Sequence, residues 1–360
     1  MPSVPYASPV RDPRRIAYAA ELALGTDHFH EPRREDCPWC GSARLCTRLR
    51  APDLLQHKPG VFVLDRCRDC GHIFQNPRLG PAGLAFYHRD HDETDPENLP
   101  DPVLALRRSH RRHRADALLM RGVGEPESWL DVGTGHGNFP AAAKEVFPYT
   151  SFDGLDPTPR VVRARAAGHI EEAHIGHLAD PRIARRLRGR YDVVSIFHHL
   201  AHAPDPRAEL RGALTVLRPG GYLLVELPDP RSAFALLLGK WWPGHGQPRH
   251  LHLLPPANLR AELQAAGCTV LVTDRRSPHR PGDLAAALAL ALARLLPPDD
   301  VPWRAVPPRT PHRVLRTLLS ALTSPLVDAT ALVEHALAPL ARRIPGLSNG
   351  YRVVARRDTA

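Results

Sequence analysis

Four of the six cysteines stand as two Cys-x-x-Cys pairs, Cys37 with Cys40 and Cys67 with Cys70. Two such pairs, separated by residues 41–66, have the spacing of a zinc ribbon, in which each pair gives two thiolates to one tetrahedral ion. Four thiolate ligands leave no open coordination position, so the predicted zinc is structural and supplies folding free energy to a small module. A redox dithiol is the alternative for a single pair, and a nucleic-acid-binding ribbon is another because arginines surround the pairs.

A second chemical signal is the run Leu130-Asp-Val-Gly-Thr-Gly-His-Gly137, which follows a strand-like segment and precedes an alanine-rich helical one. In that context glycines allow the backbone to approach a nucleotide or adenosyl ligand closely. An acid before the first glycine would repel a pyrophosphate, and Asn138 stands where a dinucleotide-binding fingerprint has its third glycine. The run therefore favours a ligand with an amine, although a purely structural strand-to-helix turn is the alternative. The candidate binding residues are Asp131, Gly133, Gly135 and Gly137.

Two polar residues at the ends of predicted strands extend this site. Asp156 ends the next strand-like segment, where a carboxylate accepts hydrogen bonds from both hydroxyls of a ribose. His202 follows the strand at residues 191–197, and its imidazole could take a proton from an acceptor hydroxyl or carbon. A capping or packing role is the alternative for His202, and a metal held by His198 and His202 is another.

These residues require a scaffold of strands whose ends meet at one edge. Strand-like and helical segments alternate through this part of the chain, which predicts an α/β fold: a Rossmann-like, parallel-type sheet with helices on both faces and right-handed crossovers. Strands are expected at residues 128–133, 151–156, 191–197, 221–227, 268–273 and 350–356, and helices at 140–147, 160–167, 206–217 and 256–266.

The glycine-rich run and Asp156, together with three later motifs, resemble the class I S-adenosylmethionine-dependent methyltransferases. The later motifs are Tyr191-Asp-Val-Val194, His202-Ala-Pro-Asp-Pro206 and Leu217-Arg-Pro-Gly-Gly-Tyr-Leu223. Upstream, the stretch from Cys67 to Pro77 and the pair Phe86-Tyr87 resemble the zinc-knuckle front end of one branch, which includes sugar and secondary-metabolite C-methyltransferases. Downstream, the segment from Arg249 to Pro255 resembles a late segment of the same branch. The resemblance covers roughly residues 67–280 and the last strand.

The resemblance implies S-adenosyl-L-methionine as the cofactor and a small molecule as the methyl acceptor. The residues of the glycine-rich run would line the methionine and ribose, and Asp156 would hold the ribose. Leu178, or its neighbours His177 and Asp180, would contact the adenine. The expected catalytic residues are His202 as the base and Tyr87, which would lie over the cofactor or acceptor.

The chain departs from the family pattern at two positions. Ala201 stands where an acidic residue is usual, and His91 stands where a second tyrosine often follows the Phe-Tyr pair. The acidic partner of His202 is therefore absent from the sequence.

Length and composition give the domain organisation. With 360 residues, the chain should hold roughly two domains, and two helical blocks at 283–296 and 313–343 are split by a proline-rich loop. We divide it into a leader (1–35), a zinc-ribbon module (36–81), a helical connection (82–127), a methyltransferase domain (128–280 plus 349–358) and a C-terminal helical insert (281–348).

The net charge of +10 invites a nucleic-acid interpretation. Arginine clusters at 107–114 and 182–190 lie outside the cofactor motifs, so we do not expect a nucleic-acid partner. The alternative function is a zinc-ribbon nucleic-acid-binding protein with a degenerate methyltransferase fold. A dinucleotide-dependent oxidoreductase is a further alternative, which Asn138 disfavours.

Residues 1–30 contain no secretory signal pattern, and the six cysteines fit a reducing compartment, so a cytoplasmic location is predicted. Charges and prolines interrupt the apolar runs at 284–296 and 314–340, which excludes a transmembrane helix. Apolar positions at helical spacing from Val314 to Leu340 predict burial against the domain or a second subunit. Homodimerisation through these helices and peripheral membrane contact both remain open.

Overall fold

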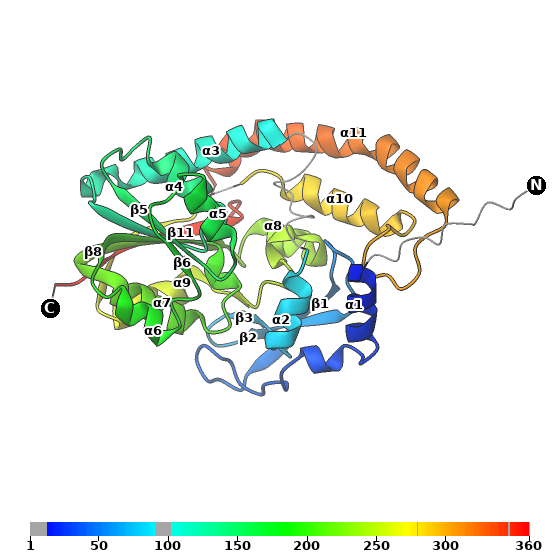
Figure 1. The fold of residues 1–360 in the computed structure, drawn as a ribbon, viewed down its shortest axis with the longest axis horizontal. Helices are drawn as coiled ribbons and strands as arrows, with labels where there is room; N and C mark the ends of the chain where they lie inside the picture. Colours follow the sequence, from blue (N-terminus) through cyan, green and yellow to red (C-terminus); the bar gives the residue numbers. More distant parts are fainter. Residues whose placement is uncertain (1–12, 91–101, 279, 345, 360) are drawn as a thin grey trace, which may run out of the picture.

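The structure, a computed structural model, describes residues 13–90, 102–278, 280–344 and 346–359. These residues form one seven-stranded and one four-stranded sheet, flanked by helices (Figure 1). The larger sheet positions the glycine-rich run, and the smaller one carries the cysteines.

The strands of the larger sheet lie in the order β10-β11-β8-β7-β4-β5-β6. Their bounds are β4 (Ser128–Val132), β5 (Ser151–Asp156), β6 (Ala173–Ile175), β7 (Tyr191–Phe197), β8 (Leu217–Pro228), β10 (Cys268–Asp274) and β11 (Gly350–Arg357). Neighbours from β8 to β6 pair in parallel, whereas β11 runs antiparallel to both β8 and β10. The predicted α/β fold class is confirmed, with one reversed strand in an otherwise parallel sheet.

Successive residues of a strand point to opposite faces of the sheet, and in these strands both sets of side chains are apolar. Helices therefore cover both faces. Trp129 and Val193 pack on one side with Phe139, in a cluster that α3 and α4 share. Leu130 and Val194 pack on the other side with side chains of α7 and α9. The helices of this region are α3 (Pro102–Leu118), α4 (Asn138–Ala143), α5 (Arg160–Ala166), α6 (Pro181–Arg186), α7 (Pro206–Val216) and α9 (Pro256–Ala265).

The four-stranded sheet is antiparallel and has the order β1-β2-β3-β9. Its strands are β1 (Leu45–Pro52), β2 (Val61–Cys67), β3 (Ile73–Gln75) and β9 (His252–Leu253). The last strand follows β8 in the chain, yet its residues His252 and Leu253 pair with Phe74 and Ile73. Main-chain hydrogen bonds therefore join the cysteine-bearing segment to the segment that follows β8.

Residues within the predicted leader belong to a hydrophobic cluster. Tyr18 of α1 (Pro13–Leu22) and Phe29 of η1 (Asp27–Phe29) pack with Phe86 and Tyr87 of α2 (Pro81–His88). Trp303, from the proline-rich loop, lies edge-on to Tyr18 with ring centroids 5.6 Å apart. Through Trp303, the proline-rich loop between the C-terminal helices packs against the N-terminal segment.

The C-terminal helices α10 (Asp283–Leu295) and α11 (Thr310–Ala341) pack on each other, and α11 runs along one edge of the molecule (Figure 1). Glu334 of α11 accepts hydrogen bonds from the backbone of Leu284 and Ala285 at the start of α10. The chain then returns to the sheet as β11, as predicted. Short helices complete the fold: η3 (Leu119–Val123), η4 (His199–Ala201), α8 (Ala233–Leu237), η5 (Gly239–Trp241) and η6 (Pro243–His245).

Candidate cofactor pocket and cysteine cluster

The four predicted metal ligands converge at the edge of the small sheet. The Sγ atoms of Cys37 and Cys70 lie 3.7 Å apart, those of Cys40 and Cys67 lie 3.5 Å apart, and all four fall within 4.8 Å of one another. Sulfurs at about 2.3 Å from a tetrahedral zinc would be about 3.8 Å apart, so the cluster has the dimensions for one ion. None of the cysteines forms a disulfide. The donor set therefore fits a closed, structural zinc site.

Two stacked histidines connect this cluster to the large sheet. His72 Nδ1 lies 3.8 Å from Cys37 Sγ, and its Nε2 lies 3.2 Å from His252 Nδ1. The other nitrogen of His252 lies 3.3 Å from the carbonyl oxygen of Pro204. A short polar path therefore runs from the cysteines through β9 to the loop after β7.

The glycine-rich run forms the turn between β4 and α4. Gly133 and Gly137 both adopt left-handed backbone angles, which residues with a Cβ rarely adopt. A Cβ on Gly133 would also lie 2.8 Å from the Cβ of His199. Glycine is therefore required at residue 133 for both conformation and space.

Asp131 is buried behind this turn. Its carboxylate accepts a hydrogen bond of 2.6 Å from the Ser195 hydroxyl, which in turn accepts one from the indole of Trp129. Burial, mainly, and the nearby charge of Asp156 raise the pKa of Asp131 to about 7, against the opposing effect of the Ser195 hydrogen bond. Two carboxyl groups thus lie near each other beside the cavity, which Arg160 also lines.

Asp156 stands at the carboxyl end of β5, where its carboxylate is tied to the glycine-rich turn. One oxygen accepts from the backbone N–H of Gly135 at 3.0 Å, and the other accepts from the backbone and hydroxyl of Thr158 at 2.8 and 2.5 Å. These bonds fix the carboxylate beside the turn, as hydroxyl recognition at this position would require.

A cavity of about 420 Å³ opens over the carboxyl ends of these strands. That volume lies within the usual range for small-molecule sites, and the position is where open α/β sheets bind ligands. The predicted residues Gly133, Gly135, Asp156 and His202 all line the cavity. The lining also includes His177 and His198, which the sequence offered only as alternatives, and His88, Arg160 and His199, which it did not mark.

Four of the predicted site residues lie outside this lining. Tyr87 is fully buried in the N-terminal aromatic cluster, and its hydroxyl donates to the carbonyl of Pro59 at 2.5 Å. Leu178 is buried under α7, where its backbone N–H donates to Glu209. Gly137 packs instead against His169. Asp131, as described, lies behind the turn.

The loop after β6 brings another polar group to the cavity. Ligand atoms of His177, His199 and Glu209 lie within 4.8 Å of one another. The Glu209 carboxylate, whose Oε1 lies 3.4 Å from His177 Nδ1, raises the pKa of His177. His199 Nε2 is buried and has no hydrogen-bond partner among the described residues. His177 and His199 of this polar cluster line the cavity, whereas Leu178 does not.

His202 lies among other imidazoles. Its ring is edge-on to His250, with centroids 4.7 Å apart, and His88 lies 5.9 Å away. Burial and these neighbours hold the pKa of His202 well below its usual range. Its Nδ1 is buried and lacks a hydrogen-bond partner within the described parts of the chain.

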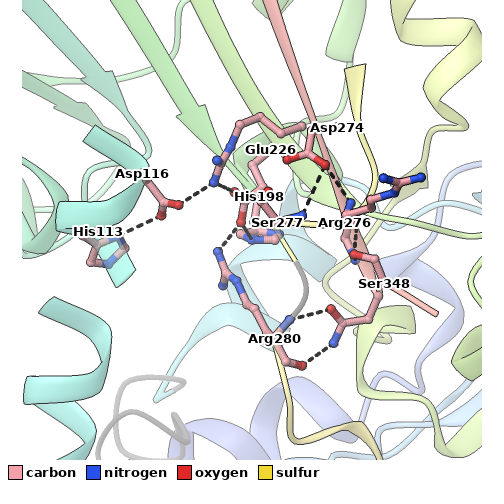
Figure 2. A network of polar contacts seen from close by, with 12 residues as sticks. His113, Asp116, His198, Glu226, Asp274, Arg276, Ser277, Arg280 and Ser348 are labelled. Carbon is pink, nitrogen blue, oxygen red and sulfur yellow. Dashed lines mark hydrogen bonds and ion pairs between the residues drawn. The ribbon is translucent and has the colours of Figure 1, made fainter. Parts of the chain in front are cut away.

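His198 has the carboxylate partner that His202 lacks. Its Nε2 lies 3.3 Å from Glu226 Oε1, and its backbone has a φ of 58°, which is rare for a residue with a Cβ. Figure 2 shows this pair between Asp116 on one side and Arg280 on the other. Arg280 and Arg352 donate to different oxygens of Glu226, at 2.7 and 2.5 Å. Burial, mainly, lowers the pKa of His198 to about 4, so its ring is neutral near pH 7.

Comparisons with known proteins agree with this geometry. Residues 107–273 match a family model described as a methyltransferase domain. The chain is 27% identical over 185 residues to a ubiquinone biosynthesis O-methyltransferase of Bordetella avium (strain 197N), and the alignment covers 48% of this chain and 73% of the relative. It is 30% identical over 145 residues to a malonyl-[acyl-carrier protein] O-methyltransferase of Hahella chejuensis (strain KCTC 2396). That alignment covers 40% of this chain and only 51% of the relative.

Solved structures show a more distant likeness. A SAM-dependent methyltransferase from Archaeoglobus fulgidus has a TM-score of 0.40 and 16% identity, covering 68% of this chain and 94% of that one. A Haloferax volcanii protein solved in complex with the Trm112 methyltransferase activator has a TM-score of 0.45 and 18% identity, covering 77% and 96%. At that level neither structure assigns a ligand or a partner to this chain. The family match over residues 107–273 and the O-methyltransferase relatives confirm the predicted enzyme class: this part of the chain is a methyltransferase domain.

Proposed function

We propose that the chain transfers a methyl group from S-adenosyl-L-methionine to a small molecule held in the 420 Å³ cavity. The observation that carries the proposal is the meeting of Gly133, Gly135 and Asp156 on one cavity wall, with Asp131 directly behind. Asp156 would accept hydrogen bonds from the ribose hydroxyls. The two carboxylates together would attract the amine and the sulfonium of the cofactor, which are both cationic.

The reaction would be a direct displacement. The bond between the methyl group and the sulfonium sulfur breaks as the acceptor forms its own bond to the methyl carbon, and the cofactor leaves as a neutral thioether. An acceptor hydroxyl must also lose its proton, which requires a base within hydrogen-bonding reach. The O-methyltransferase relatives support a hydroxyl or carboxyl acceptor, whereas the sequence resemblance to C-methyltransferases supports a carbon acceptor.

We infer that His198 serves as this base and that His202 lines the acceptor side of the cavity. With Nε2 of His198 donating to Glu226, the lone pair of Nδ1 is available to accept a proton. Glu226 would stabilise the imidazolium that forms, as the third group of a nucleophile-base arrangement does. Arg280 and Arg352 keep Glu226 ionised and hold the pKa of this carboxyl well below its usual range.

The cysteine cluster would hold one zinc ion with Cys37, Cys40, Cys67 and Cys70. With four protein thiolates the ion has no position for a substrate, so it would act on folding and not on methyl transfer. The domain boundaries predicted from the sequence remain our proposal for how these modules divide.

Binding of S-adenosylhomocysteine tests the proposed cofactor site. Calorimetry on the full chain should show binding, and Asp156→Asn should weaken the affinity by at least about tenfold because two charge-assisted hydrogen bonds are lost. Glu127→Gln is the matched control, since this exposed acid stands next to the opposite end of β4 and should bind like the wild type. No binding by the folded, zinc-loaded protein, combined with steeply salt-dependent binding of RNA or DNA, would favour the nucleic-acid alternative instead.

A further inference from the structure

The helix α11 turns its large apolar side chains away from the rest of the protein. Nine of these side chains are 47–76% exposed: Val314, Leu315, Leu318, Leu322, Leu326, Leu332, Val333, Leu337 and Leu340. They recur at the three- and four-residue spacing of one helix face, which we call the outer face of α11. The predicted burial of these residues against the chain's own domain is therefore wrong.

The opposite side of α11 is mostly small and polar, with Val327 half-buried among these residues. Glu334, Ala338 and Ala341 are buried, and Thr323 and Thr330 are half-buried on the same side, where Glu334 binds the start of α10. A helix on a protein surface normally places its apolar stripe on the core. Because α11 does the reverse, its outer face is suited to an apolar environment outside this chain.

Cations bracket the outer face. Arg309 and Arg313 lie at the start of α11, where Arg313 pairs with Asp300 at 2.7 Å, and Arg342 and Arg343 follow its end; all four are exposed. Within Thr310–Ala341, which the structure describes completely, the acids are the exposed Asp328 and the buried Glu334. Arginines at both ends of an apolar helix face match the anionic headgroups that surround the acyl region of a bilayer.

A second copy of the chain fits this face less well. In a parallel pair of α11 helices, the arginines at each end would lie beside the same arginines of the other helix. In an antiparallel pair, Arg309 would lie beside Arg342 and Arg343. Either arrangement places like charges together, with Asp328 as the exposed acid of the helix. An anionic bilayer presents the opposite charge to both ends at once.

We propose that the outer face of α11 binds the surface of an anionic phospholipid bilayer, with the helix parallel to the membrane plane. None of the helices within the described residues is long and apolar enough to cross a membrane, so the proposed contact is peripheral. The leucines would enter the boundary between headgroups and acyl chains, and the flanking arginines would remain among the phosphates. This inference does not depend on the cofactor site.

Vesicle flotation with the full chain tests the proposal. Binding to phosphatidylcholine vesicles that contain phosphatidylglycerol should exceed binding to pure phosphatidylcholine by roughly tenfold or more, because several arginines meet anionic headgroups. The variant L318Q/L322Q/L326Q removes three exposed leucines while keeping good helix formers, and should weaken binding by at least roughly a hundredfold.

The control variant is L24Q/Y149Q/V162Q, which changes three exposed apolar side chains outside α11 and should bind vesicles like the wild type. Circular dichroism of each variant verifies that it is folded. Light scattering on the same samples measures the oligomeric state and so distinguishes a second copy of the chain from a bilayer as the occupant of the outer face. A dimer that dissociates in L318Q/L322Q/L326Q, together with no binding to either vesicle, would overturn the proposal in favour of a second copy. Equal binding of that variant and the wild type to anionic vesicles would overturn it as well.

Discussion

At the scale of single residues, the buried carboxyl of Asp131 has the clearest consequence. Its pKa is raised to about 7, so the folded protein keeps a proton that the unfolded chain loses near pH 4. The stability that this proton contributes is complete below the unfolded pKa and is lost as pH rises through about 7. Ionisation of Asp131 near neutral pH therefore destabilises the free protein, and a cationic ligand would offset this cost.

We predict that Asp131 loses its proton when the cofactor product binds between pH 6 and 7. Calorimetry with S-adenosylhomocysteine in two buffers of different ionisation enthalpy should give different heats, and Asp131→Asn should abolish the difference. In the absence of ligand, wild-type stability should fall as pH rises toward 7, by up to about 1.4 kcal/mol per pH unit, and the variant should lack this slope. Equal heats in both buffers for the wild type would show that Asp131 does not respond to the ligand.

The assignment of the base gives a second prediction at this scale. His198→Ala should lower kcat by about 10²- to 10⁴-fold with a hydroxylated acceptor, without changing the affinity for S-adenosylhomocysteine. Added imidazole should restore part of the rate, which a purely structural defect would not allow. The matched variant His202→Ala keeps the His198–Glu226 pair and should retain more activity. Imidazole rescue of His202→Ala alone would transfer the role to His202, as the sequence predicts.

The sequence predicts some of these residues and not others, for a physical reason. Asp131 and Asp156 can be predicted because glycines and strand ends lie next to them in the chain. The role of His198 depends on Glu226, Arg280 and Arg352, which come from separate segments and meet only in the folded protein. No local pattern marks such a contact.

At the scale of elements, β9 ties the cysteine cluster to the cofactor cavity. Its two residues complete the small sheet, and the preceding residue, Leu251, donates its backbone N–H to the carbonyl of Ala201 at 2.7 Å. Ala201 and His202 belong to the loop that borders the cavity. Loss of the proposed zinc should therefore loosen a segment far along the chain from the cysteines.

We predict that Cys40→Ser lowers the bound zinc well below one ion per chain and speeds amide hydrogen exchange at residues 250–254. Affinity for S-adenosylhomocysteine should fall several-fold through the displaced loop. Cys46→Ser is the matched control, because Cys46 lies on β1 outside the cluster. Exchange that accelerates only within residues 36–80 would show that the cysteine-bearing segment folds independently of the cavity.

Most strands of the large sheet were predictable, since most of them are apolar and the helices between them have clear periodicity. The three-residue β6 and the two-residue β9 were not, because strands that short carry no periodic signal. Tyr18 and Phe29 show the same limit. They lie in a segment rich in proline and charge that suggests a leader, yet Trp303, from the other end of the chain, covers Tyr18.

At the scale of the whole molecule, the sequence predicts the class of enzyme and the order of its parts but not how the parts face one another. The helical spacing of residues 314–340 predicts that one face of α11 is apolar. It does not tell which way that face points, because the inner contact depends on Glu334 reaching the start of α10. The structure shows that the apolar face points outward, and this orientation is the basis for proposing a membrane surface.

The place of β11 in the sheet has a consequence for how the protein is made. This strand follows the C-terminal helices in the chain, yet it lies between β8 and β10, and its Arg352 supports Glu226 behind the cavity. During synthesis, β8 and β10 leave the ribosome before the strand that joins them, so the sheet has a gap until residues 350–357 emerge. A chain truncated before residue 350 would therefore lose an interior strand of the sheet and not an edge strand.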